Sequence, residues 1–175
     1  MFPKEKSLIG KIYLICGEKN EGKTTRLRQL FSSMRNACGF AADKVFDGDS
    51  LIGYNLVNLC SGDAIPLARI HALSGECAAE GFINGPFRFS TAAFIWAREV
   101  FEDALRLKAD AFFLDEVGRI ELAAGGHSKL LYAALNSNVK IYMTVRDSSL
   151  RDVLRAFGIG EYTRIGIHQQ PVPQS

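Results

Sequence analysis

Residues 12–24 read Ile-Tyr-Leu-Ile-Cys-Gly-Glu-Lys-Asn-Glu-Gly-Lys-Thr. A short apolar run leads to Gly17, and Gly22, Lys23 and Thr24 follow it with the spacing Gly-x-x-x-x-Gly-Lys-Thr. This is the pattern of a phosphate-binding loop (a Walker A motif). It stands between a strand-like and a helix-like segment, which is the setting that such a loop requires. The stretch therefore predicts that the chain binds a nucleoside triphosphate.

The residue types of this loop suit a polyphosphate. Glycines let successive backbone N–H groups point inward, and the following helix adds its unpaired amides and the positive end of its dipole. We expect Lys23 to reach the β- and γ-phosphates and the hydroxyl of Thr24 to bind Mg²⁺. The expected nucleotide contacts come from Gly17, Glu18, Lys19, Asn20, Glu21, Gly22, Lys23, Thr24 and Thr25.

The loop also contains two acidic residues. Glu18 and Glu21 place carboxylates in a loop that binds anions, although both side chains can face water because the loop binds mainly through its backbone. The competing interpretation is a glycine-rich strand-to-helix turn with a surface lysine. The match at all four fixed positions in the required setting favours the phosphate loop.

The composition limits the classes of function. The 175 residues predict a single domain over 1–175, with a polar tail at about 169–175. A net charge of +2 and the absence of a Lys/Arg run do not indicate nucleic acid as a partner. No apolar stretch has the length of a membrane helix, and the first residues do not read as a signal peptide. The four cysteines form no Cys-x-x-Cys pair, so we expect a cytoplasmic protein.

Apolar patterning predicts strands that alternate with helices. The expected strands are 8–16, 39–46, 51–60, 66–73, 111–116, 139–145 and 161–167, and the expected helices are 23–34, 90–107 with Ser90 as its N-cap, 127–135 and 148–157. Asp47-Gly48 between apolar runs predicts a β-hairpin, and residues 81–86 read as a loop. This order predicts an α/β three-layer sandwich with a mostly parallel sheet and an antiparallel β-hairpin insertion.

A second candidate segment is Ala-Phe-Phe-Leu-Asp-Glu at residues 111–116, an apolar run that suits a strand buried on both faces. Ligands of open α/β sheets bind at the carboxyl ends of the strands, so we expect Asp115 and Glu116 to lie beside the phosphate loop. Asp115 matches a Walker B aspartate that helps to hold Mg²⁺. Glu116 can activate a water for attack on the γ-phosphate. The alternative, an ordinary acidic strand end, is less favoured given the loop upstream.

Charge that develops on the γ-phosphoryl group usually requires a further cation. Arg146, at the end of the strand at 139–145, is the first candidate, and Arg119 and Arg88 follow. Each of the three can instead be a surface or structural arginine, and the cation can also come from another molecule.

Three segments carry a resemblance to the THEP1-type nucleoside-triphosphatase family. They are the loop at 17–25, the segment Phe-Leu-Asp-Glu-Val-Gly-Arg-Ile-Glu-Leu at 113–122, and the strand Ile-Tyr-Met-Thr-Val-Arg at 141–146 with the helix after it. The second segment is similar to the family's Asp-Glu-Ile-Gly-x-Met-Glu-Leu signature. It is the specific part, because phosphate loops occur in many families.

The resemblance implies a RecA-like P-loop NTPase core and slow, Mg²⁺-dependent hydrolysis of ATP, GTP and other nucleoside triphosphates. It gives Lys23, Thr24, Asp115 and Glu116 the phosphate, metal and water-activating roles. Glu121 matches a signature residue whose role the sequence does not explain. The match is loosest over residues 61–90, from which base contacts could come.

Two other functions would use the same loop. A nucleotide or small-molecule kinase needs an acceptor pocket and an arginine-rich lid, whereas the stretch after Asp115 holds one arginine and no long basic insert. A nucleotide-gated interaction protein would bind its partner through the hairpin at about residues 40–60, with incidental hydrolysis. Hydrolysis of nucleoside triphosphates as the main activity is favoured over both.

Overall fold

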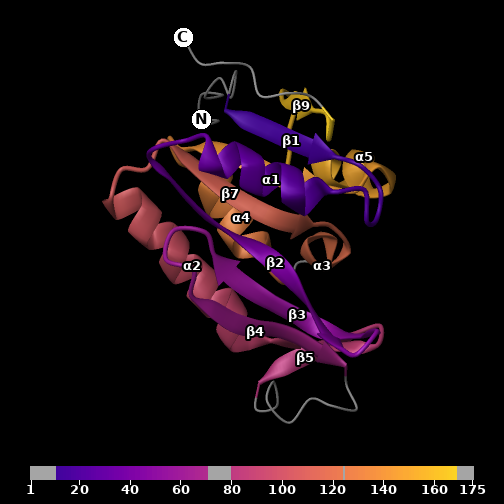
Figure 1. Cartoon of the computed structure of the whole chain (residues 1–175). Helices are drawn as coiled ribbons and strands as arrows, with labels where there is room; N and C mark the ends of the chain where they lie inside the picture. The colour runs from indigo at the N-terminus through magenta and orange to yellow at the C-terminus, as the bar shows by residue number, and fades with distance from the viewer. Residues whose placement is uncertain (1–10, 71–79, 124, 169–175) are drawn as a thin grey trace.

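A nine-stranded sheet forms the centre of the part of the chain that the computed structural model describes, which is residues 11–70, 80–123 and 125–168 (Figure 1). The strand order is β5-β6-β4-β3-β2-β7-β8-β1-β9. The strands are β1 (Ile12–Cys16), β2 (Ala37–Asp47), β3 (Ser50–Asn58), β4 (Ala64–Ile70), β5 (Gly81–Asn84), β6 (Phe87–Ser90), β7 (Ala111–Val117), β8 (Lys140–Val145) and β9 (Thr163–Ile165). The helices are α1 (Lys23–Ser32), α2 (Thr91–Arg106), α3 (Arg119–Leu122), α4 (Ser128–Leu135) and α5 (Asp147–Ala156).

One half of the sheet is parallel and positions the site. Strands β2, β7, β8, β1 and β9 all run in the same direction. Strand β8 lies between β1, which leads into the phosphate loop, and β7, which ends in the acidic pair. Because parallel strands present their carboxyl ends at one edge, the two predicted motifs meet there although they lie far apart in the sequence.

Helices cover both faces of this parallel half, as predicted for a three-layer sandwich. Side chains of β7 alternate between the faces, with Phe113 packing toward α1 and Phe112 packing toward α2, α4 and α5. The ring of Phe31 on α1 meets Phe113 edge-on with 5.5 Å between centroids. Figure 1 shows α1 in front of the sheet and α4 behind it. Burial on both faces explains why residues 111–114 are apolar without interruption.

The predicted hairpin is present. Strands β2 and β3 pair in antiparallel fashion, and Asp47 faces Ser50 across a loop of two residues. Gly48 begins that loop with a φ of +56°, a conformation that hairpin turns of this length require at their first position and that glycine adopts without strain.

The antiparallel part extends beyond this hairpin through β4, β6 and β5. The prediction of a loop over residues 81–86 is wrong, because β5 covers four of these residues and pairs with β6. Gly85-Pro86 is the turn of this second hairpin. The ring of Phe82 stacks on Phe89 of β6 at 5.4 Å, and this aromatic contact stabilises two strands that are too short to show a pattern in the sequence.

Other boundaries agree with expectation within a few residues. The hydroxyl of Ser90 accepts a hydrogen bond from the backbone N–H of Ala93 at 3.4 Å, which confirms Ser90 as the N-cap of α2. The strand expected at 66–73 is observed as β4, and residues 71–73 lie outside the described part. The short helix α3 was not predicted. None of the described helices is both long and apolar enough to cross a membrane.

Candidate active site

The phosphate loop joins β1 to α1 where the sequence predicts it. Gly22 has a φ of +94° and is the N-cap residue of α1, so a left-handed residue turns the chain into the helix. The side chain of Lys23 is almost completely buried, and its ammonium donates to the backbone oxygen of Glu18 at 2.6 Å. The loop thus folds around its own lysine, which places the cation inside the curve that the loop forms.

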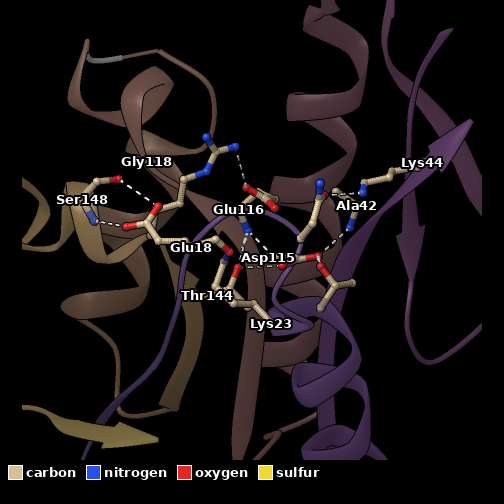
Figure 2. A network of polar contacts seen from close by, with 12 residues as sticks. Glu18, Lys23, Ala42, Lys44, Asp115, Glu116, Gly118, Thr144 and Ser148 are labelled. Carbon is tan, nitrogen blue, oxygen red and sulfur yellow. Dashed lines mark hydrogen bonds and ion pairs between the residues drawn. The ribbon is translucent and has the colours of Figure 1, made fainter. Parts of the chain in front are cut away.

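The two loop carboxylates have specific partners. A carboxylate oxygen of Glu21 accepts the N–H of Glu18 at 2.7 Å. The carboxylate of Glu18 points out of the loop and accepts the N–H of Ser148 at 2.9 Å and its hydroxyl at 3.4 Å (Figure 2). Both glutamates are exposed, yet neither simply extends into water. No pattern in the sequence predicts these contacts.

Asp115 lies at the end of β7 and is only 2% exposed. One carboxylate oxygen accepts the hydroxyl of Thr24 at 2.8 Å and the N–H of Ala42 at 3.1 Å. The other accepts the hydroxyl of Thr144 at 2.6 Å and the N–H of Glu116 at 3.1 Å (Figure 2). Burial raises the pKa of Asp115, while the hydrogen bonds from Thr144 and Thr24 act in the opposite direction. The structure therefore brings the predicted Walker A threonine and Walker B aspartate into direct contact.

Glu116 occupies a bulge in β7. The pairing of β7 with β8 shifts by one residue between Leu114 and Val117, and Glu116 has a φ of +59°. A residue other than glycine in this conformation carries strain of about 1–3 kcal/mol. The bulge turns the Glu116 side chain outward, where it is 43% exposed. The hydroxyl oxygen of Thr144 accepts the N–H of Glu116 at 2.7 Å and supports the strained backbone.

The three candidate arginines lie in different places. Arg146 directly follows β8, and its guanidinium is 3.8 Å from the carboxylate of Glu116. Arg119 is the exposed first residue of α3. Arg88 belongs to β6 in the antiparallel half, where the sheet register places it opposite Ile83 of β5 and Arg69 of β4. Within the described part of the chain, Arg146 is the one of the three that forms an ion pair with the acidic pair.

Glu121, the signature residue without a predicted role, has a structural explanation. Its carboxylate is buried and accepts the N–H of Gly118 at 2.9 Å and the N–H of His127 at 3.1 Å. Burial raises the pKa of Glu121, and these backbone hydrogen bonds act against that rise. The side chain therefore links Gly118, just after β7, to His127, just before α4.

Sequence reasoning missed two further residues of the site. Thr144 binds both Asp115 and Glu116, as described above. Its signal in the sequence is a single hydroxyl within the buried strand Ile-Tyr-Met-Thr-Val, where an unpaired polar group would be costly. Lys44 on β2 donates to the side-chain oxygen of Asn20 at the tip of the phosphate loop, 2.7 Å away. An exposed lysine on a strand carries no comparable signal.

A family model described as NTPase matches residues 12–166 of the chain, which includes the loop, the acidic pair and Arg146. The chain belongs to this NTPase family. Membership makes the protein a nucleoside-triphosphatase, and it confirms the resemblance and the kind of enzyme that the three segments indicated.

Named relatives of this NTPase agree with the assignment. The chain is 30% identical over 145 residues to the nucleoside-triphosphatase THEP1 of Pyrobaculum calidifontis, which covers 81% of this chain and 74% of that protein. It is 27% identical over 148 residues to the THEP1 of Pyrobaculum aerophilum, which covers 83% and 79%. The fold is similar to the crystal structure of THEP1 from Aquifex aeolicus, with a TM-score of 0.66 at 18% identity over 89% and 88% of the two chains.

Proposed function

We propose that this NTPase hydrolyses Mg²⁺-bound nucleoside triphosphates to the diphosphate and phosphate at the edge formed by β1, β7 and β8. The observation that carries the proposal is the 2.8 Å hydrogen bond between Thr24 and Asp115. It joins the phosphate loop to the acidic pair across 91 residues of sequence.

The donor set suits Mg²⁺. This ion prefers oxygen ligands, and it is usually held by one or two protein groups together with substrate phosphates. The hydroxyl of Thr24 and the carboxylate of Asp115 supply such oxygens side by side. In the described part of the chain, the buried carboxylate of Asp115 has hydroxyl and backbone N–H partners and no lysine or arginine partner. Burial raises its pKa, and a bound cation would stabilise its charged form. When bound, Mg²⁺ would neutralise charge on the β- and γ-phosphates.

The remaining groups of the site have separate roles in this proposal. The amides of residues 17–25 and the ammonium of Lys23 bind the phosphates. The carboxylate of Glu116 orients a water and takes its proton, which its exposed position beside the buried Asp115 permits. Arg146 balances charge on the γ-phosphoryl group, and the distance of 3.8 Å between its guanidinium and the carboxylate of Glu116 supports this role.

Release of phosphate from a panel of nucleoside triphosphates, with and without Mg²⁺ and with no added acceptor, tests the proposal. We expect turnover with ATP and GTP that disappears when Mg²⁺ is chelated. Lys23→Ala should weaken nucleotide binding, because it removes the buried cation of the loop. Formation of the nucleoside diphosphate only after an acceptor is added, without release of free phosphate, would favour a kinase. Undiminished binding by Lys23→Ala would contradict the role of the loop.

A further inference from the structure

The carboxylate of Glu18 connects two parts of the site that the chain places 130 residues apart. It accepts the backbone N–H of Ser148 at 2.9 Å and the hydroxyl of the same residue at 3.4 Å. Figure 2 shows the two side chains facing each other, Glu18 from the phosphate loop and Ser148 from the start of α5. Glu18 also contributes its backbone, since its carbonyl oxygen accepts the ammonium of Lys23 at 2.6 Å.

The first turn of α5 is a junction within the site. Arg146 is the N-cap residue of this helix, and its carbonyl accepts the N–H of Ser149 at 2.9 Å. The guanidinium of Arg146 points to Glu116 at 3.8 Å. Asp147, the next residue, forms an ion pair with Arg164 of β9 at 2.5 Å. The start of one helix therefore contacts the phosphate loop, the acidic pair and the last strand.

A helix start leaves backbone N–H groups without partners inside the helix. A carboxylate is a favourable partner for them, because it accepts a charge-assisted hydrogen bond and complements the positive end of the helix dipole. The accepting group of such a cap usually belongs to a residue next to the helix in sequence. Here no side chain of the N-cap residue caps α5, and the carboxylate comes from the loop that surrounds Lys23. The contact thus fixes the distance between the loop and the helix that carries Arg146.

We propose that Glu18 is a positioning residue for hydrolysis: its carboxylate holds the first turn of α5 against the phosphate loop, and so places Arg146 relative to the phosphates that Lys23 binds. The inference rests on the proposed function, because it assumes that Lys23 and Arg146 act on the same triphosphate. It also explains why a glutamate stands at position 18, although its negative charge would disfavour an anion in the loop.

Steady-state hydrolysis of Mg·ATP by Glu18→Ala and Glu18→Gln tests the proposal. We expect Glu18→Ala to lower kcat about tenfold, with KM changed by less than about threefold, because small misplacement of a catalytic group reduces turnover more than binding. Glu18→Gln should recover most of the loss, since its amide oxygen can still accept the N–H of Ser148. Asp152→Ala removes an exposed carboxylate from the same helix and serves as the matched control, with wild-type kcat.

A double-mutant cycle separates positioning from a purely local cap. If Glu18 acts through Arg146, the Glu18→Ala/Arg146→Ala variant should have the kcat of Arg146→Ala alone. Multiplied losses in the double variant, or a wild-type kcat in Glu18→Ala despite a lower melting temperature, would overturn the inference. Those outcomes leave the proposed function intact if Glu116→Gln is inactive. An active Glu116→Gln would instead count against the function itself.

Discussion

The hydroxyl of Thr144 donates a hydrogen bond to Asp115 at 2.6 Å, and the same oxygen accepts the backbone N–H of Glu116 at 2.7 Å. Thr144 is completely buried in β8. This strand lies between β1, which leads into the phosphate loop, and β7, which ends in the acidic pair. A single side chain thus orients the carboxylate proposed to hold Mg²⁺ and supports the backbone of the carboxylate proposed to activate water.

Thr144→Val tests this relationship, because it replaces the hydroxyl with a methyl group of similar size. It leaves a buried carboxylate oxygen of Asp115 and the N–H of Glu116 with fewer partners. We expect the free energy of unfolding to fall by about 1–3 kcal/mol and the Mg²⁺ concentration for half-maximal activity to rise. Urea denaturation and a Mg²⁺ titration of phosphate release measure the two effects.

Thr144→Ser is the control for this prediction. It keeps the hydroxyl and should restore the Mg²⁺ dependence, even if the lost methyl group lowers stability. If Thr144→Val requires no more Mg²⁺ than the wild type, the hydroxyl has no part in positioning Asp115.

The left-handed conformation of Glu116 predicts that a glycine at this position would raise stability and abolish activity. Glycine adopts a φ of +59° without the strain that other residues carry, so Glu116→Gly should raise the free energy of unfolding by roughly 1 kcal/mol while it removes hydrolysis. Glu116→Gln keeps the strain and should unfold like the wild type. Equal stability of the glycine and glutamine variants in chemical denaturation would show that the bulge stores no strain at this residue.

His127 predicts a dependence of stability on pH. The imidazole lies between the rings of Phe40 and Phe94, at 4.7 and 4.8 Å, and burial lowers its pKa from 6.5 to about 3. In the folded state it therefore stays neutral down to about pH 3, whereas in the unfolded state it takes up a proton near pH 6.5. Its contribution to stability is complete above pH 6.5 and is lost as the pH falls, with a slope of at most about 1.4 kcal/mol per pH unit.

His127→Phe should remove this part of the acid sensitivity, because phenylalanine suits the aromatic surroundings and does not titrate. Thermal unfolding between pH 4.5 and 7 measures the slope. His168→Gln, at an exposed histidine, is the control and should keep the wild-type slope. A His127→Phe protein that loses stability with acid as steeply as the wild type would assign the effect to other groups.

Arg146→Ala tests the proposed catalytic cation. Removal of the guanidinium beside Glu116 should lower kcat by at least about tenfold and leave KM nearly unchanged, because the charge it balances develops in the transition state. Arg88→Ala is the comparison, since Arg88 lies in the antiparallel half of the sheet. A wild-type kcat for Arg146→Ala would remove this residue from the mechanism.

The parallel core and the two main motifs could be predicted because their signals are local. A glycine pattern between a strand and a helix, and an apolar run that ends in two carboxylates, each occupy fewer than about ten consecutive residues. Topology then required both to lie at one edge of the sheet. The hairpin at Asp47 and the cap at Ser90 were predictable for the same reason, since turn and cap residues act on their neighbours.

The unpredicted features depend on partners distant in sequence. The bond between Glu18 and Ser148 spans 130 residues, and no pattern around either residue indicates the other. The bulge at Glu116 arises from its pairing with β8, so its strained conformation is not visible in the strand's own sequence. Strands β5 and β6 contain four residues each, too few to show an alternating pattern, and the contact between Phe82 and Phe89 joins residues on different strands.

The most direct test compares binding and hydrolysis of Mg·ATP by Glu116→Gln in the same preparation. Calorimetric titration gives the dissociation constant, and single-turnover release of phosphate gives the rate of hydrolysis. If the loop, Thr24 and Asp115 hold the nucleotide while Glu116 activates water, the variant should bind within about threefold of the wild type and lose at least about a hundredfold in rate. Wild-type hydrolysis by Glu116→Gln would contradict the account.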